Sequence, residues 1–275
     1  MQYRDFLRKE TCNTIPDYIS LPRGYYLVGY VALLTLSSGA LKYKKEIGKA
    51  TLDYNDKIKS VALKIGPTRD LTRKPHYELV AGNRDTLTTH IENGVVFRID
   101  PLKFTFSRGN RHERINIPTI VQHNEFVVDM FACVGQFALH IARNTDARVT
   151  AIEINPEAFE LLQENIRLNR VENRVDALLG DCREIHPIGA ADRVIMGYLH
   201  DSIEYLPAGL ETLKPIGGWI HLHSGIPKHR IGYYCNTIDT IAREAGFSAN
   251  IETREIKHYS PGIVHYVFDI FLAPY

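Results

Sequence analysis

The chain has 275 residues, 44% of them apolar, which is enough to bury the core of one large domain or two small ones. Its 33 basic and 32 acidic side chains leave a net charge of +1 and a pI near 7.7. This balance excludes a globally basic nucleic-acid-binding protein, so a site for a polyanion must be a local patch.

Local patterns argue against two further classes of protein. The longest apolar run, residues 25–36, is too short to span a bilayer, and the first ten residues are too charged for a signal peptide. The four cysteines are scattered without a CxxC pair, which predicts neither a zinc site nor a disulfide framework. We therefore expect a soluble cytoplasmic protein that uses no metal and contacts no membrane.

Residues 1–100 lack β–α alternation and predict a small α+β domain. Its expected elements are strands at 26–34, 60–65, 76–80 and 94–99 and a helix at 40–52. Candidate phosphate contacts in this domain are the basic residues Lys42, Lys45, Arg73 and Lys74. The alternative is that these residues form a solvated helix face and a basic loop.

Residues 101–119 are expected to link this domain to the rest of the chain. They concentrate a serine and three arginines, namely Ser107, Arg108, Arg111 and Arg114. A guanidinium in such a segment can pair bidentately with a carboxylate or a phosphate. The alternative is a solvated linker.

From residue 120 to residue 275, strands alternate with helices. Strands are expected at 126–128, 148–153, 175–180, 192–198 and 218–223, and helices at 137–142, 156–169, 203–213 and 234–245. Residues 249–258 and 263–272 predict a final hairpin. A Rossmann-like α/β sheet closed by an antiparallel terminal hairpin is the arrangement of AdoMet-dependent transferases.

Chemistry-bearing residues follow the expected strands of this sheet. Asp129 precedes a turn that contains Phe131 and, after it, small residues up to Gly135. Glu153 follows Asp129 by 24 residues and ends the second strand. The third strand is followed by Asp181 and Cys182, and the fourth ends at Tyr198. Because the carboxyl ends of parallel strands meet at one edge, these residues are expected to line one crevice.

This pattern predicts an adenosyl site. Glu153 would accept hydrogen bonds from ribose hydroxyls, and Asp181, aided by the Cys182 N–H, would accept one from the adenine amino group. Phe131 would line the methionine or the adenine. The alternative is that the carboxylates cap helices or close turns.

Four stretches, residues 100–114, 127–137, 191–200 and 258–265, together resemble one family. It is that of the archaeal wybutosine-synthesis aminocarboxypropyltransferases, which are related to the tRNA guanosine-N1 methyltransferases. The resemblance extends from about residue 77 to the end of the chain, and more faintly before it. Met-Gly-Tyr-Leu-His at 196–200 favours the first branch, because the methyltransferases usually have an Asn-Leu-Pro type sequence there.

The resemblance implies two domains, with AdoMet bound in the second and tRNA held by both. It implies that Ser107 and Arg114 contact the methionine part of AdoMet. The chain departs from the family in its turn, which usually reads Asp-Met-Phe-Ala-Gly-Ile-Gly, because Cys133 replaces the first glycine. If that position requires a positive φ, the cysteine costs stability and narrows the cofactor pocket.

The activity that the resemblance implies is transfer of the 3-amino-3-carboxypropyl group of AdoMet, a co-substrate, to C7 of 4-demethylwyosine. The base would lie in the anticodon loop of tRNA(Phe), and methylthioadenosine would leave. Tyr198 and His200 are the candidate catalytic residues, with a flipped-out base expected near Tyr198 or Phe106. Two alternatives stay open: methyl transfer to guanosine N1 or to the tricyclic base, and a catalytically silent tRNA-binding protein. A monomer is the expectation, although the sequence does not determine the oligomeric state.

Overall fold

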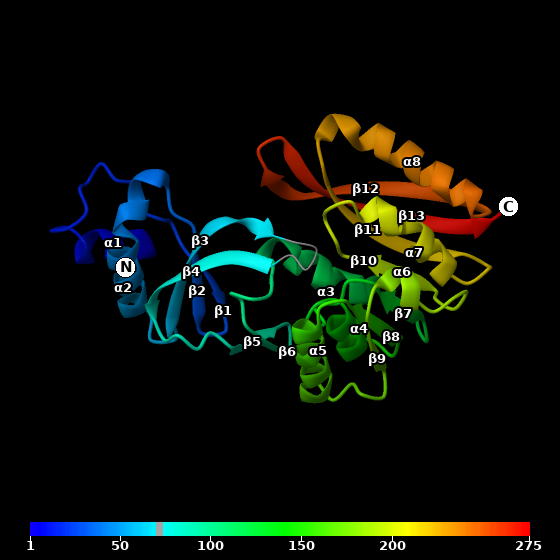
Figure 1. Cartoon of the computed structure of the whole chain (residues 1–275), viewed down its shortest axis with the longest axis horizontal. Helices are drawn as coiled ribbons and strands as arrows, with labels where there is room; N and C mark the ends of the chain where they lie inside the picture. Colours follow the sequence, from blue (N-terminus) through cyan, green and yellow to red (C-terminus); the bar gives the residue numbers. More distant parts are fainter. Residues whose placement is uncertain (70–73) are drawn as a thin grey trace. The chain divides into compact units, whose positions relative to one another are not determined.

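The computed structural model describes residues 1–69 and 74–275, which divide into two units, Met1–Arg108 and Gly109–Tyr275 (Figure 1). Each unit has its own hydrophobic core. No helix in the described part of the chain combines the length and apolarity needed to cross a membrane.

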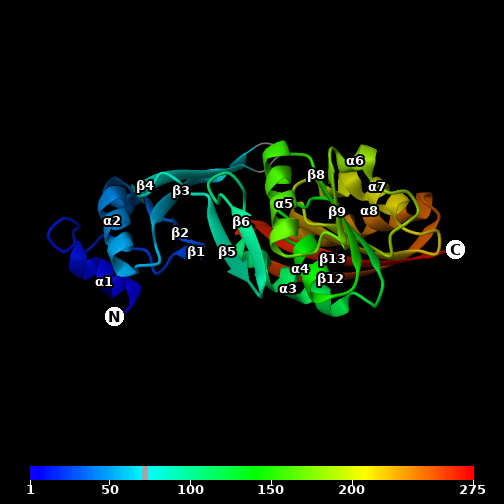
Figure 2. The same cartoon turned by 90° about the horizontal axis from the view of Figure 1, so that it is seen from below.

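The first unit is built on a four-stranded sheet of order β1-β2-β3-β4. Its strands are β1 (Tyr26–Val28), β2 (Val31–Leu34), β3 (Ser60–Arg69) and β4 (Lys74–Gly82), and its helices are α1 (Tyr3–Glu10), the 3-10 helix η1 (Ser38–Tyr43) and α2 (Lys44–Tyr54). Helix α2 packs on β3 and β4 (Figure 2). A separate hairpin, β5 (Thr88–Glu92) with β6 (Val95–Ile99), completes this unit.

The expected single strand at 26–34 is wrong, because Gly29 turns the chain between β1 and β2. Gly29 has φ +55°, and a Cβ on it would lie 2.0 Å from the Thr88 Oγ1 atom. Only glycine fits such a close approach, so this segment is a hairpin. Helix α1 and strand β5 were not predicted.

The second unit contains a seven-stranded sheet of order β12-β13-β11-β10-β7-β8-β9. Its strands are β7 (Phe126–Asp129), β8 (Arg148–Glu153), β9 (Val175–Leu179), β10 (Arg193–Met196), β11 (Gly218–Ile226), β12 (Phe247–Ser260) and β13 (Ile263–Pro274). Strands β7 to β11 are parallel, and β13 pairs antiparallel with β11 and β12. The predicted fold class, a Rossmann-like sheet with an antiparallel terminal hairpin, is confirmed.

The helices of this unit are α3 (Arg111–Ile120), α4 (Ala138–Asn144), α5 (Pro156–Leu168), α6 (Cys182–Ile185), α7 (Leu206–Thr212) and α8 (Ile231–Glu244). Short 3-10 turns lie at Arg108–Asn110, Ser202–Tyr205 and Lys228–Arg230. Helix α3 occupies a stretch that was expected to be a linker, and Pro118 lies inside it.

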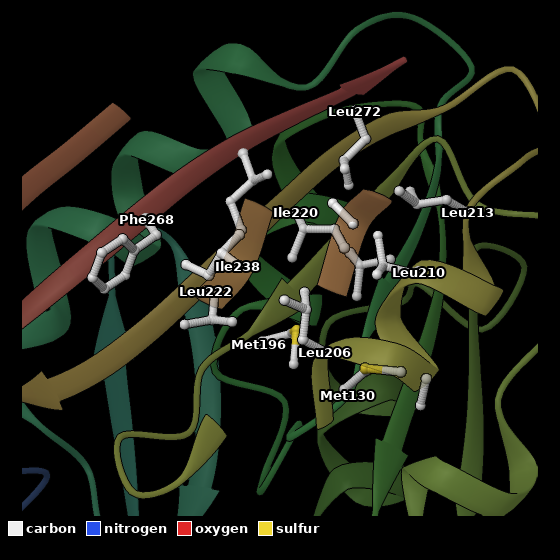
Figure 3. Close-up of a cluster of buried hydrophobic side chains, with 14 of the residues drawn as sticks. Met130, Met196, Leu206, Leu210, Leu213, Ile220, Leu222, Ile238, Phe268 and Leu272 are labelled. Atoms are coloured by element: carbon white, nitrogen blue, oxygen red, sulfur yellow. The ribbon is translucent and has the colours of Figure 1, made fainter. Parts of the chain in front are cut away.

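Strands β10, β11 and β13 present two contrasting faces, because successive residues of a strand point to opposite sides. The first, here called the apolar face, packs against α7 and α8 in a buried cluster (Figure 3). Its strand residues are Val194, Met196, Ile220, Leu222, Phe268, Ile270 and Leu272. The second, here called the ionic face, carries Arg193, His221, His223, His265 and Asp269.

Candidate functional site

The turn after β7 is organised by Asp129, which is fully buried. One carboxylate oxygen accepts a hydrogen bond from the Phe131 N–H (3.3 Å), and the other accepts one from the Ala138 N–H (3.2 Å) at the start of α4. Burial raises the pKa of Asp129 to about 7, although these two hydrogen bonds oppose the rise. Asp129 therefore closes the turn and provides a hydrogen-bond acceptor for a backbone N–H in the first turn of α4.

Two residues of this turn have left-handed backbones. Cys133 has φ +50° and Gly135 has φ +95°, and a Cβ on Gly135 would lie 2.7 Å from Leu139. Position 133 therefore has the positive φ at which a cysteine is expected to cost stability, and its backbone is strained. Burial, reinforced by Glu153, raises the pKa of the Cys133 thiol to about 12, which argues against a nucleophilic role.

Glu153 ties the end of β8 to the same turn. Its Oε2 accepts a hydrogen bond from the Cys133 N–H and its Oε1 accepts one from the Asn155 N–H, both at 2.7 Å. Burial raises the pKa of this carboxyl group. The Ile154 N–H also bonds to this carboxylate, whose roughly four lone-pair sites still leave capacity to accept a hydrogen bond from a ligand.

Two exposed apolar residues flank Glu153 and were not singled out from the sequence. Ile154 follows it directly and is 47% exposed, and Leu179, the register partner of Glu153 on β9, is 48% exposed. Together they offer apolar surface to a flat ring at the ends of two neighbouring strands. An apolar residue immediately after a strand-ending acid was the signal available in the sequence.

Asp181 is the N-cap of α6, and its side chain accepts a hydrogen bond from the Arg183 N–H at 2.9 Å. The Arg183 guanidinium also donates to both carboxylate oxygens, which lowers the pKa of Asp181. Cys182, the first residue of α6, is buried. The capping alternative therefore describes a real local role of Asp181.

Aromatic rings gather beside the turn at the end of β10. Phe131 and Tyr198 stack with ring centres 5.1 Å apart, and Tyr205 meets Phe131 edge to face at 5.0 Å. From Tyr198 the contacts continue to His200 (6.4 Å) and then to Tyr259 (5.8 Å). Tyr205 and Tyr259 were not predicted, since neither follows a strand of the parallel sheet.

Arg114 is a buried cation at this site, with 1% of its surface exposed. Its Nη1 donates to the Gln136 Oε1 atom in the turn at 3.3 Å. A guanidinium held in a dry environment favours a carboxylate or phosphate partner. Ser107 is half-buried in the first unit, and the Arg108 and Arg111 side chains are exposed.

The candidate phosphate contacts of the first unit lie at its surface. Lys45 and Lys74 are exposed, and the exposed Lys42 ammonium lies 4.9 Å from the centre of the Tyr43 ring. Arg73 lies outside the described residues. Across residues 1–69 and 74–275, no group of three or more His, Cys, Asp or Glu side chains is placed to hold a metal ion.

These features fit a nucleoside that carries an amino acid. Glu153 supplies acceptors for hydroxyl groups, Ile154 and Leu179 supply apolar surface, and the buried Arg114 supplies a cation for a carboxylate.

Two family models match the chain. The model of the TRM5/TYW2 methyltransferase domain matches residues 88–252, and that of the TYW2 N-terminal domain matches residues 3–86. Among curated proteins, the tRNA(Phe) (4-demethylwyosine(37)-C(7)) aminocarboxypropyltransferase of Pyrococcus horikoshii is 36% identical, covering 97% of this chain and 95% of that protein. The tRNA (guanine(37)-N(1))-methyltransferase Trm5b of Pyrococcus abyssi is 33% identical, covering 88% and 72%.

Two solved structures are similar over most of their length. P. horikoshii TYW2 in complex with MeSAdo has a TM-score of 0.86 at 33% identity, covering 98% of this chain and 99% of that one. M. jannaschii TYW2 in complex with AdoMet has a TM-score of 0.74 at 30% identity, covering 91% and 100%.

Proposed function

The chain belongs to the TRM5/TYW2 family, and from this membership we propose that it transfers the 3-amino-3-carboxypropyl group of AdoMet to C7 of 4-demethylwyosine in tRNA(Phe). The observation that carries this proposal is the likeness to the P. horikoshii aminocarboxypropyltransferase over nearly the whole of both chains. The Met-Gly-Tyr-Leu-His sequence at 196–200 supports the same branch of the family.

In this proposal the residues of the second unit hold AdoMet in three parts. Glu153 accepts hydrogen bonds from the ribose, Asp181 and the Cys182 N–H bind the adenine, and Arg114 pairs with the carboxylate. The turn that contains Phe131 and Gly135 and is closed by Asp129 passes close to the ligand. Ser107 belongs to the first unit and remains an expectation from the resemblance.

The transfer forms a bond between C7 of the base and the side-chain methylene of AdoMet and breaks the bond from that methylene to sulfur. The sulfonium leaves as neutral methylthioadenosine, and the C7 proton passes to a base, which later releases it to solvent. The chain's task is then mainly positioning. Tyr198 supplies a face for the flipped-out base, and His200 is the candidate proton acceptor beside it.

tRNA is the substrate in the names of the relatives, and we extend this to the anticodon loop of tRNA(Phe). The N-terminal domain and the 101–119 segment would contribute phosphate contacts through Lys42, Lys45, Arg73, Lys74, Arg108 and Arg111. A chain with a net charge of +1 binds RNA through such local patches. We also propose that the protein acts as a cytoplasmic monomer.

The test is incubation of the protein and tRNA(Phe) bearing 4-demethylwyosine with AdoMet labelled in either the carboxyl or the methyl group. We expect only the carboxyl label to enter tRNA. Entry of the methyl label alone would assign the chain to methyl transfer. If neither label enters and calorimetry detects no binding of AdoMet at millimolar concentration, the protein is a silent tRNA binder.

The phosphate contacts have a separate test. If the basic residues touch tRNA, the logarithm of the association constant falls linearly with the logarithm of salt concentration. Replacing Lys42 and Lys45 by Gln should lower that slope by about one for each phosphate that is no longer neutralised. An unchanged slope would remove these two lysines from the footprint.

A further inference from the structure

Six polar side chains form a continuous chain that runs from α3 across the ionic face. In order they are Glu113, Arg254, Asp269, His221, Arg193 and Glu125. The Arg254 Nη1 and Nη2 atoms donate to the two oxygens of Glu113, each at 2.9 Å, and its Nε donates to Asp269 at 2.5 Å. At the other end, the Arg193 Nε atom donates to Glu125 at 2.7 Å. This set is here called the ionic chain.

His221 joins the two halves of the ionic chain as a neutral ring. Its Nδ1–H donates to Asp269 at 2.6 Å, and its Nε2 accepts from Arg193 at 2.6 Å. Burial lowers the pKa of His221, although Asp269 opposes this, and the lowered pKa agrees with an Nε2 that must stay an acceptor. Donor and acceptor therefore alternate without a gap from Glu113 to Glu125.

The ionic chain fixes α3 at both ends. Glu113 lies in its first turn and is fully buried, and the carbonyl of Ile120, its last residue, accepts from the Arg193 Nη2 atom at 3.1 Å. Arg114 follows Glu113 directly and reaches the turn at Gln136. A shift of α3 along or about its axis would therefore displace the Arg114 guanidinium.

Stability alone gives no reason for this arrangement. The side chains of Glu113, Arg193 and Glu125 are at most 10% exposed, and apolar residues of similar volume often stabilise a fold as well as a buried ion pair does. The opposite face of the same strands is filled in that apolar way. A buried ionic chain does, however, allow one arrangement of its donors and acceptors and so holds a helix in register.

We propose that Glu113 and Arg254 are positioning residues, which lock α3 so that Arg114 meets the carboxylate of AdoMet and the side-chain methylene, not the methyl group, faces the base. This deepens the proposed function and rests on it. Neither residue touches the reacting atoms.

The test compares two ligands that differ in the group Arg114 would bind. AdoMet carries the amino-acid carboxylate, and methylthioadenosine lacks it. In Glu113→Gln and Arg254→Met we expect AdoMet to bind about 10- to 100-fold more weakly, because a displaced Arg114 loses charge-assisted hydrogen bonds to the carboxylate. Methylthioadenosine should change less than about twofold, because its contacts do not include Arg114. Arg143→Met, an exposed arginine on α4, is the matched control and should leave both affinities unchanged.

A second readout follows the product. With doubly labelled AdoMet, the positioning variants should raise the ratio of methyl to aminocarboxypropyl label in tRNA. Arg254→Lys keeps the positive charge but loses the two-pronged guanidinium, so its label ratio should lie between those of wild type and Arg254→Met. Equal weakening of both ligands, or of neither, overturns the proposal, and urea unfolding identifies variants that fail to fold. The ligand comparison needs no tRNA, so it stands even if the wild-type enzyme transfers methyl.

Discussion

The two faces of β10, β11 and β13 differ sharply in chemistry, although the same strands form both. On one side Ile220, Leu222 and Phe268 pack into a dry core with α7 and α8. On the opposite side of the same strands, Arg193 and His221 belong to a line of hydrogen bonds with acidic partners. The same strands thus serve two purposes: the apolar face stabilises the unit, and the ionic face holds α3 in place.

The largest expected effect comes from breaking the ionic face at its centre. Arg193→Met removes the partner of Glu125, of His221 and of the Ile120 carbonyl, and should lower the free energy of unfolding by about 3 to 5 kcal/mol, since a buried charge is left alone. Urea unfolding followed by the fluorescence of Trp219, the single tryptophan, measures this directly, because its ring centre lies 5.9 Å from Arg193.

The double variant Arg193→Met with Glu125→Leu sharpens the same comparison. If charge isolation causes the loss, removing both partners should recover most of it. A double variant as unstable as Arg193→Met would show that shape, rather than charge, decides the stability of this face.

A cavity in the apolar face should cost slightly less. Leu222→Ala truncates a fully buried side chain and is expected to lower the free energy of unfolding by about 3 kcal/mol, without changing the AdoMet affinity of the folded protein. Leu168→Ala, 46% exposed on α5, is the control and should stay within about 0.5 kcal/mol of wild type. Equal losses in the two variants would contradict the assigned core.

The ionic face should also respond to pH through His223. Burial, followed by the neighbouring His221, lowers its pKa to about 3, while its Nδ1 lies 3.0 Å from His265. A histidine whose pKa is lower in the folded state binds protons only on unfolding, so its stabilisation is complete above pH 6.5 and declines as the pH falls. Between pH 6.5 and 5 the loss is about 2 kcal/mol.

His223→Gln should remove that part of the acid sensitivity. The measurement is the change in urea midpoint between pH 7 and pH 5, taken for wild type and for the variant. Asp129, whose raised pKa acts in the opposite direction, is present in both proteins, so its effect cancels in the comparison. Identical pH dependence in the two proteins would mean that folding does not lower the pKa of His223.

The smallest effect is expected at the turn that carries the cofactor site. Cys133→Gly relieves a left-handed backbone but adds freedom to the unfolded chain, so a net gain of about 0.5 kcal/mol is expected. Differential scanning calorimetry should detect a slightly higher Tm. A lower Tm would show that the packing of the cysteine side chain outweighs its strain.

Much of the second unit could be read from the sequence, because its signals are local. Asn155 and Pro156 mark the start of α5, and the Asn155 side chain accepts from the Glu157 N–H as an N-cap should. Strand β8 matches its expected bounds. Acidic residues at the ends of β7 and β8 meet at one turn, since Glu153 bonds to the Cys133 N–H.

The ionic chain could not be read in this way. His221 and Asp269 alternate with apolar residues, a pattern that is typical of a sheet with one solvated face. His221 is buried and Asp269 is mostly buried, on the face to which Glu113 ties α3. Helix α3 was not expected, since Pro118 and a charged first turn weaken its helical pattern. Burial here depends on a partner 141 positions away in the chain, the distance between Glu113 and Arg254.

The contrast between the two faces also fixes the register of the strands in this sheet. If β11 moved by one residue against β10 and β13, its histidines would enter the leucine layer and its isoleucine and leucine would interrupt the line of charges. Both layers would fail together, so a sheet misaligned by one residue is much less stable than the correct one. The register shifts of β12 and β13 lie between Glu255 and Ser260, beyond Arg254, where a change of register leaves the ionic chain intact.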